Sequence, residues 1–258
     1  MHRVEHLWGT AISVEVVDAD CVATDTVDAL YAWFERVDEL FSTWRDDSEI
    51  SRIGRGELAV ADASPAVATV LALCDEVRVL SGGAFDVTFG ARARLDPRPG
   101  LGPLDPSGLV KGWAVERAAA MLLDAGVRQF CINAGGDVVV RGRPPAQAAW
   151  RIGIQHPWER DKVAAVVCMV DGAVATSGGY ERGDHVIDPR TGQPAHGLAS
   201  VTVVGRDLAI ADAYATAAFA LGPDGMTWLA GRADVEAMGI TDDRRVVTTP
   251  GFEQYRAA

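Results

Sequence analysis

One aspartate and one threonine stand a single helical turn apart in a segment that is otherwise apolar. Asp212 and Thr216 belong to an alanine-rich stretch that ends at Gly222. Residues four apart project from the same face of a helix. A carboxylate beside a hydroxyl, with no Lys or Arg at helical spacing, suits a hard cation such as Mg²⁺. The alternative is that Asp212 caps the helix or faces solvent, while Thr216 bonds to a carbonyl of its own helix.

The residues around this pair predict a strand, a turn and a helix in succession. Val201–Val204 is a β-branched run that is typical of a buried strand. A turn follows at 205–207, and Gly222 occupies the position of a helix C-cap. We therefore expect Asp212 and Thr216 to lie on a buried helix that packs against a sheet.

A second candidate site lies where a loop leads into another helix. Asp105, Ser107 and Gly108 directly precede a helix that is expected to end at Gly126, and Lys111 falls in its first turn. A helix N-terminus and a lysine both attract anions, so this segment predicts a phosphate site. The alternative is an ordinary capped helix with a solvated lysine.

Three further segments have the composition of ligand-binding or turn regions. Gly82–Gly90 places an Asp and a Thr between glycines, which permits a close backbone approach to a ligand or simply makes a turn. Asn133–Asp137 predicts a tight hairpin or a close approach of the backbone. Thr176–Gly197 is a long polar stretch around a short predicted strand, His185–Ile187, and its length and composition favour a functional loop.

Charge and composition narrow the classes of partner. The 258 residues are 48% hydrophobic and 23% charged, which is ordinary for a globular protein, and the formal net charge is −12. Such a charge argues against binding to nucleic acid or to an anionic membrane. A phosphate ligand would need a metal, a helix N-terminus or local basic residues to offset the repulsion.

The sequence shows no zinc or redox motif, and we expect no targeting segment. The cysteines are far apart, with no CxxC or Cys/His cluster, so we interpret Cys21, Cys74, Cys131 and Cys168 as small buried hydrophobes in a reducing compartment. No signal core is present, and no apolar run approaches the roughly 20 residues of a membrane span. We expect a cytoplasmic protein.

The order of predicted elements indicates an α+β fold with largely antiparallel sheets in a single domain, 1–258. Strands and helices do not alternate strictly, and the sequence lacks GxGxxG after a strand, GxxxxGK[ST] and HExxH. The remaining elements that we expect are a strand His6–Val17 interrupted at Gly9-Thr10, helices Asp25–Phe41, Pro65–Leu80 and Met226–Gly231, a strand pair Val127–Val140, and strands Trp150–Ile154, Lys162–Met169, Ala173–Ser177, Val235–Ile240 and Val246–Thr249.

Taken together and in order, these segments resemble the ApbE-type flavin transferases (FAD:protein FMN transferases). The resemblance runs from about Leu7 to Gly222. The motifs that carry it are GT at Gly9-Thr10, STWRDDSEISRI at Ser42–Ile53, GGAFDVT at Gly82–Thr88, DPSGLVKGWAVE at Asp105–Glu116, NAGGD at Asn133–Asp137, WRIGIQHP at Trp150–Pro157, TSGGY at Thr176–Tyr180, HVIDPRTGQP at His185–Pro194 and ADAYATAAFALG at Ala211–Gly222.

The resemblance implies an ApbE-like fold and a magnesium-dependent reaction on FAD. In that reaction FMN passes from FAD to a Thr or Ser hydroxyl of a target flavoprotein, and AMP is released. The resemblance leaves two alternatives open, an Mg²⁺-dependent FAD pyrophosphatase that gives FMN and AMP, and a non-catalytic FAD-binding protein.

The resemblance also assigns roles to individual residues. It implies metal ligands at Asp212, Thr216 and the backbone carbonyl of Gly108. We expect His185 to accept the proton of the target hydroxyl, because a histidine pKa lies near neutrality, and Asp188 to orient His185 or to bind the ligand. The implied FAD contacts are Trp8, Ala84, Phe85, Asp86, Asp105, Lys111 and Val186.

Overall fold

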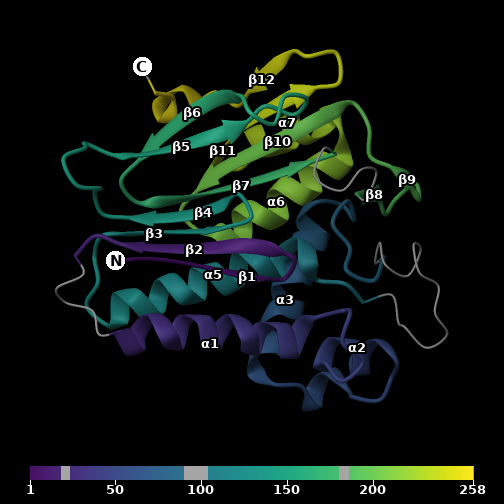
Figure 1. Ribbon diagram of the computed structural model, residues 1–258. Coiled ribbons are helices and arrows are strands. Elements are labelled where there is room, and N and C mark those ends of the chain that lie inside the picture. Colours follow the sequence, from purple (N-terminus) through teal and green to yellow (C-terminus); the bar gives the residue numbers. More distant parts are fainter. Residues whose placement is uncertain (19–23, 90–103, 180–185, 258) are drawn as a thin grey trace.

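The protein is built around one antiparallel sheet with helices on one face. The computed structural model describes residues 1–18, 24–89, 104–179 and 186–257. Its eight-stranded sheet has the order β1-β2-β3-β4-β7-β10-β11-β12, and every ladder in it is antiparallel (Figure 1). The strands are β1 (His2–Leu7), β2 (Thr10–Val16), β3 (Phe130–Ala134), β4 (Asp137–Arg141), β7 (Gly172–Gly178), β10 (Leu198–Gly205), β11 (Val235–Thr241) and β12 (Val246–Thr248). The prediction of an α+β fold with largely antiparallel sheets is confirmed.

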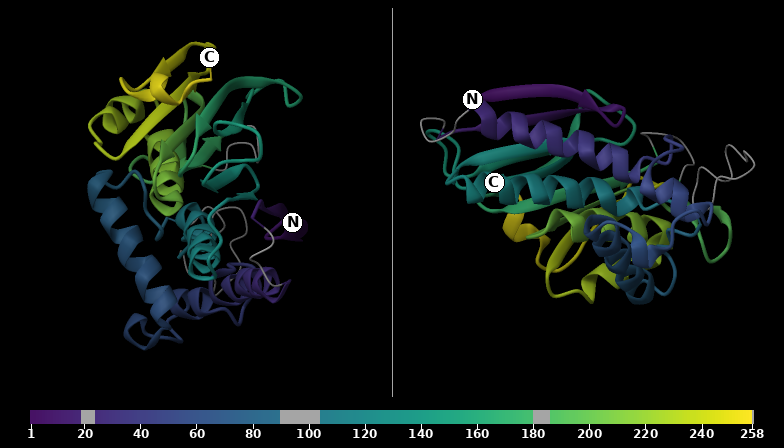
Figure 2. Two further views of the ribbon diagram at one scale, coloured as in Figure 1. Left: turned by 90° about the vertical axis from the view of Figure 1, so that its left-hand side faces the viewer. Right: turned by 90° about the horizontal axis from the view of Figure 1, so that it is seen from below.

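The helices lie on one face of this sheet, and a small hairpin lies on its other face (Figures 1 and 2). Helix α6 lies against β7 and β10, and α5 lies between α6 and α1. The hairpin pairs β5 with β6, and the 3-10 helix η3 packs beside it. The bounds are α1 (Thr24–Phe41), α2 (Glu49–Gly54), α3 (Pro65–Leu80), α5 (Ser107–Asp124), α6 (Leu208–Leu221), α7 (Pro223–Ala230), β5 (Trp150–Gln155), β6 (Val163–Met169), β8 (Ile187–Asp188), β9 (Gln193–Pro194), η2 (Val60–Asp62) and η3 (Phe252–Tyr255).

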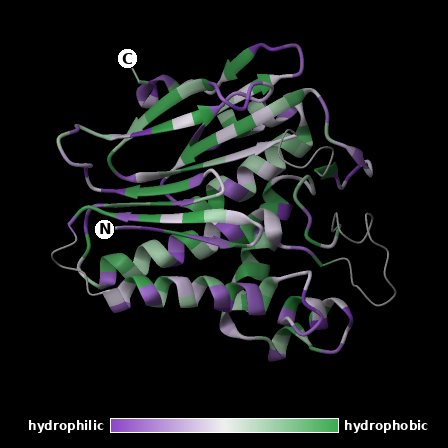
Figure 3. Cartoon of the chain, viewed as in Figure 1, coloured by the Kyte–Doolittle hydropathy of each residue, from purple (hydrophilic) through white to green (hydrophobic). Residues whose placement is uncertain are grey.

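Both faces of the middle strands β4, β7, β10 and β11 are buried, and successive residues of these strands enter two different cores. Val139 joins the larger core beneath the helices, whereas Val138 and Val140 join the smaller core under the β5–β6 hairpin. This alternation follows from the two-residue period of a strand. Because both faces of these strands are buried, their sequences are continuous apolar runs, as Figure 3 shows for the middle of the sheet.

Most predicted elements are found, and their ends have the expected caps. Ser64 accepts a hydrogen bond from the Val67 amide at the start of α3. Asp207 accepts one from the Ile210 amide at the start of α6, and α6 ends at Gly222, whose φ is 63°. The carboxylate that caps α6 is therefore Asp207 and not Asp212.

The segment expected as one interrupted strand, His6–Val17, is instead a hairpin of β1 and β2. Trp8 and Gly9 form its turn with φ values of 56° and 74°. Two successive left-handed residues match the right-handed twist of a two-residue hairpin, which is why the chain reverses here and does not continue.

Two features of the secondary structure go beyond the predicted elements. The polar segment 41–54, in which no helix was predicted, contains α2, whose N-cap Ser48 accepts from the Ser51 amide at 3.1 Å. The predicted strands Lys162–Met169 and Ala173–Ser177 enter different sheets, because β6 pairs with β5 whereas β7 lies in the central sheet.

Two glycines allow α5 and α6 to pack closely. A Cβ atom on Gly112 would lie 2.4 Å from the Leu208 carbonyl oxygen and 2.9 Å from Asp212 Cβ. A Cβ on Gly108, one turn earlier, would lie 3.2 Å from the Thr216 side chain. The absence of side chains at these positions therefore sets the distance between the two helices that carry the predicted site.

We predict that Gly112→Ala destabilises the protein by about 1–3 kcal/mol, because the added methyl group must push α5 away from the backbone of α6. The free energy of unfolding in urea is the measurement. Gly153→Ala is the matched control, because its Cβ would meet only Val163 side-chain atoms at 3.4 Å or more, and we expect a change within about 0.5 kcal/mol. Equal effects of the two substitutions would contradict this account of the helix packing.

Candidate functional site

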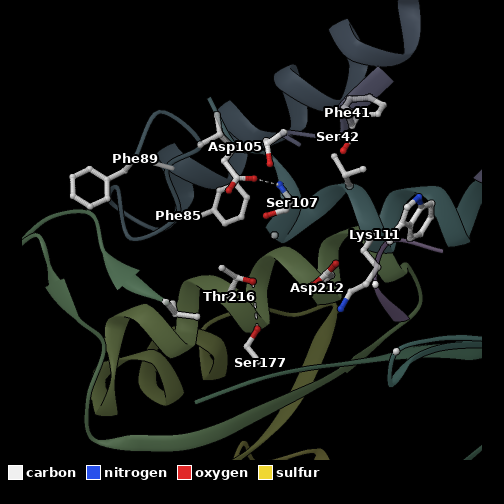
Figure 4. A pocket seen from close by; sticks show the side chains of 18 of the residues that line it. Phe41, Ser42, Phe85, Phe89, Asp105, Ser107, Lys111, Ser177, Asp212 and Thr216 are labelled. Atoms are coloured by element: carbon white, nitrogen blue, oxygen red, sulfur yellow. Dashed lines mark hydrogen bonds between the residues drawn. The ribbon is translucent and has the colours of Figure 1, made fainter. Parts of the chain in front are cut away.

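A cavity of about 970 Å³ opens at the end of the sheet where α5 begins. Its walls come from the β1–β2 turn, the segment after α1, the loop after α3, the start of α5, the end of β7, the segment around β8, and α6 (Figure 4). The predicted site residues that line it are Trp8, Ala84, Phe85, Asp86, Asp105, Gly108, Lys111, Val186, Asp212 and Thr216. These side chains are far apart in the sequence, and the fold brings them to one cavity.

Asp212 and Thr216 face this cavity from α6. Asp212 is only 5% exposed, and its Oδ2 accepts a hydrogen bond from the Gly112 amide of α5 at 3.0 Å. The Thr216 hydroxyl lies 3.3 Å from the Ser177 hydroxyl of β7. Asp212 neither caps its helix nor faces solvent, and Thr216 pairs with a neighbouring strand, so the alternative interpretation of this pair is wrong.

The donors beside Asp212 have the chemistry of a site for a hard cation. Gly108 packs against the Thr216 side chain, so a carboxylate, a hydroxyl and the backbone of Gly108 meet at one place. Within the described part of the chain, no group of three or more His, Cys, Asp or Glu side chains is placed to hold a metal. Mg²⁺ keeps several waters and takes few protein oxygens, so this oxygen donor set fits Mg²⁺.

Lys111 forms an ion pair with Asp137, a residue that was not predicted to belong to the site. Its Nζ lies 2.8 Å from Oδ2 of Asp137, whose side chain is 1% exposed, and the Thr176 amide donates to Oδ1 at 3.1 Å. Burial raises the pKa of the Asp137 carboxyl, and the Lys111 ammonium beside it acts against that rise. The signal in the sequence was the aspartate that ends NAGGD, directly at the start of β4.

The loop before α5 is positioned by its own aspartates. Asp105 Oδ1 accepts from the Ser107 amide at 3.1 Å, and Asp86 Oδ1 accepts from both the amide and the hydroxyl of Thr88. Helix α5 begins at Ser107, so Gly108 lies inside the helix rather than before it, and Lys111 lies just beyond the first turn. Both of these positions differ slightly from the predicted ones.

Aromatic side chains form the apolar part of the cavity wall. The Trp8 indole packs edge-on against Phe34 at 5.4 Å, and its Nε1 donates to the Phe34 carbonyl. Phe85 is buried, whereas Trp44 is 74% exposed at the cavity rim. Trp44 was not selected from the sequence, although an aromatic residue in a polar segment was a usable signal.

Of the two residues predicted to act on the proton of the acceptor hydroxyl, His185 and Asp188, the structure describes Asp188. His185 lies outside the described residues. Asp188 does not line the cavity, although its neighbours Ile187 and Pro189 do. It is buried, and it accepts hydrogen bonds from the Arg190 amide and guanidinium, each at 2.9 Å. Its role toward His185 therefore stays a prediction, and its demonstrated role is to hold Arg190.

Comparison with known proteins gives this cavity its context. The model of the ApbE family matches residues 8–96 and 95–239. The chain belongs to the ApbE family. Among curated relatives, the FAD:protein FMN transferases of Vibrio cholerae and Klebsiella pneumoniae are 28% and 27% identical, over 87% and 84% of this chain and 80% and 77% of those proteins. The one from Rhodobacter capsulatus is 38% identical over 57% of this chain but 30% of that protein.

Solved ApbE structures have the same fold. The flavin transferase ApbE of Vibrio cholerae superposes with a TM-score of 0.87 at 24% identity, covering 99% of this chain and 98% of the other. The ApbE protein of Thermotoga maritima gives 0.87 at 23% identity, covering 100% and 99%. Among the described residues, no helix has both the length and the apolarity that crossing a bilayer requires.

We predict that Asp188→Asn lowers stability by about 1 kcal/mol at pH 7, a modest value because Arg190 is 40% exposed. The hydrogen bonds from Arg190 lower the pKa of the Asp188 carboxyl in the folded state. Its stabilising effect is therefore present above the unfolded pKa of about 3.9 and is lost as the pH falls through the lower folded pKa. Urea unfolding at pH 7 and pH 3 should show a larger difference between variant and wild type at pH 7 than at pH 3.

Proposed function

We propose that this ApbE-family protein is an Mg²⁺-dependent FAD:protein FMN transferase acting as a single domain, 1–258. It moves FMN from FAD to the hydroxyl of a Thr or Ser in a target flavoprotein and releases AMP. The observation that carries the proposal is the meeting of Asp212, Thr216 and the Gly108 backbone in the wall of a cavity of about 970 Å³, which is large enough for a dinucleotide-sized ligand. The names of the curated relatives support the same activity.

Three groups of this chain would hold the cation: the Asp212 carboxylate, the Thr216 hydroxyl and the Gly108 carbonyl. A bound Mg²⁺ would supply neutralisation of the diphosphate charge, which phosphoryl transfer requires more than it requires covalent assistance. Packing of Gly108 and Gly112 against α6 keeps these donors together before any ligand enters. This preorganisation is what the helix packing contributes to the reaction.

The rest of the cavity would bind FAD and orient its diphosphate. Lys111 and the N-terminal end of α5 oppose the phosphate charge in a protein that is acidic overall. Asp105, Val186 and residues 84–86 contact the nucleotide from the facing walls, and Trp8 offers an aromatic surface to a ring system. Phe85, buried beneath the loop, helps to exclude water from this end of the cavity.

The transfer step needs an in-line hydroxyl and a group to take its proton. The oxygen of the acceptor Thr or Ser forms a bond to the phosphorus of the FMN half, and the bond from that phosphorus to the AMP oxygen breaks. His185 takes the proton of the acceptor hydroxyl, and Asp188 helps to place the segment that carries it. We place this work in the cytoplasm, where the thiols of Cys74, Cys131 and Cys168 would stay reduced, as they are in the structure.

Hydrolysis of FAD by water would use the same residues. An experiment must therefore distinguish transfer of FMN to a protein from hydrolysis. Incubation with FAD, Mg²⁺ and a candidate acceptor protein should give covalent flavin fluorescence on a denaturing gel, together with AMP. Production of free FMN and AMP with every plausible acceptor would identify a pyrophosphatase instead. Binding of FAD without any product would identify a non-catalytic flavin-binding protein.

We predict that Asp212→Asn lowers the rate of covalent flavin transfer by about a hundredfold or more, because the cation loses the charged member of the proposed ligand set. Asp207→Asn, on the same helix but outside the cavity, is the matched control, since Asn also caps a helix N-terminus well. It should keep the wild-type rate. Normal Mg²⁺-dependent turnover in Asp212→Asn would show that the metal assignment is wrong.

A further inference from the structure

Two ion pairs connect α5 to β4, one at each end of the contact between them. Lys111 pairs with Asp137 beside the cavity, and Glu116 pairs with Arg141 farther along both elements. Glu116 also accepts from the Leu208 amide at the start of α6, and neither Glu116 nor Arg141 lines the cavity. The second pair therefore joins three elements, whereas the first pair lies against the predicted metal site.

Within the described part of the chain, Lys111 and the Thr176 amide are the groups that stabilise the charge of Asp137. Its side chain is 1% exposed, and the Thr176 amide already occupies Oδ1. An uncompensated buried carboxylate is strongly unfavourable, and burial accordingly raises the pKa of Asp137. This requirement draws the Lys111 ammonium, which is 29% exposed, down to the sheet.

Lys111 stands between two carboxylates. Figure 4 shows its amino group beside Asp212, and the Gly112 amide that follows it in α5 donates to Asp212. A lysine that pairs fully with Asp212 would compete with a divalent cation for the same oxygens. The ion pair with Asp137 gives the ammonium another partner and so weakens that competition.

We propose that Asp137 is a positioning residue for the metal site: it holds Lys111 toward the sheet so that the Asp212 carboxylate can bind a divalent cation. This inference rests on the proposed function, because it takes Asp212 as a metal ligand. It adds a role for a residue of β4 that does not itself line the cavity. It also explains why a lysine can lie next to a metal ligand without replacing the metal.

The test measures Mn²⁺ binding to the full chain, with and without FAD, by electron paramagnetic resonance of the free ion. Asp137→Asn keeps the shape of the side chain and the acceptor for the Thr176 amide, but it releases Lys111 toward Asp212. We expect its dissociation constant for Mn²⁺ to rise about 10- to 100-fold, as is typical when the support of a metal ligand is removed.

The double variant Asp137→Asn/Lys111→Met separates this explanation from simple damage to the fold. With both charges gone, no ammonium competes for Asp212, so Mn²⁺ should bind at least as tightly as in wild type. The double variant replaces both partners by neutral groups of similar size, which is better tolerated than loss of one partner. It therefore provides a readout even if the single variant folds poorly.

Glu116→Gln is the matched control, because it removes the charge from the other ion pair between the same two elements. We expect a lower melting temperature with Mn²⁺ affinity unchanged. Wild-type affinity in Asp137→Asn, or a double variant that binds tenfold more weakly than wild type, would overturn the inference while Asp212→Asn still abolishes binding. If Asp212→Asn leaves Mn²⁺ binding unchanged, the proposed metal site falls as well.

Discussion

The close approach of α5 and α6 is the constraint on which the site depends. Gly112 lies against the Leu208 carbonyl at a distance that leaves no room for a methyl group, and Gly108 lies against Thr216 with little space for one. The same contact lets the Gly112 amide reach Asp212. The helix that carries Asp212 and the helix that begins at Ser107 are thus held together mainly by contacts of the α5 backbone. Such contacts are less adjustable than those between flexible side chains.

The sheet supports these helices with small residues where α6 crosses it. Ala173 and Ala175 of β7 face the larger core, and the helix itself is rich in alanine. Small side chains on both surfaces bring α6 near the strands, so Thr216 can reach Ser177. The polar groups of the site are satisfied across element boundaries, which ties their positions to the fold as a whole.

Local features of the site were predictable, and long-range pairings were not. The Asp212–Thr216 spacing, the Gly222 end of α6 and the Ser64 cap follow from patterns within a few residues, and the structure has the same helix ends. The pairing of Lys111 with Asp137 spans 26 positions and needs the knowledge that β4 lies beside α5. No sequence period carries that information, because it arises only when the sheet order is set.

The Trp8-Gly9 turn shows a second reason why the sequence does not predict every element. A tryptophan is a poor candidate for a left-handed conformation, so the sequence predicts one strand interrupted at Gly9-Thr10 and not a reversal of the chain at Trp8-Gly9. Asp188 could have been assigned its partner from the sequence, because Arg190 is only two residues away. His185, outside the described residues, keeps its role only as an expectation from the resemblance and the chemistry.

Because the interior is divided into two cores, residues that affect only stability are separated from residues that shape the cavity. The smaller core contains Trp150, Val167 and Phe252 with the outward-facing valines of the sheet, and none of its members lines the cavity. Packing changes there alter how much folded protein a cell keeps, while the shape of the cavity is left to the larger core. Substitutions on the hairpin side of the sheet can therefore change the stability of this protein without changing the residues that line the cavity.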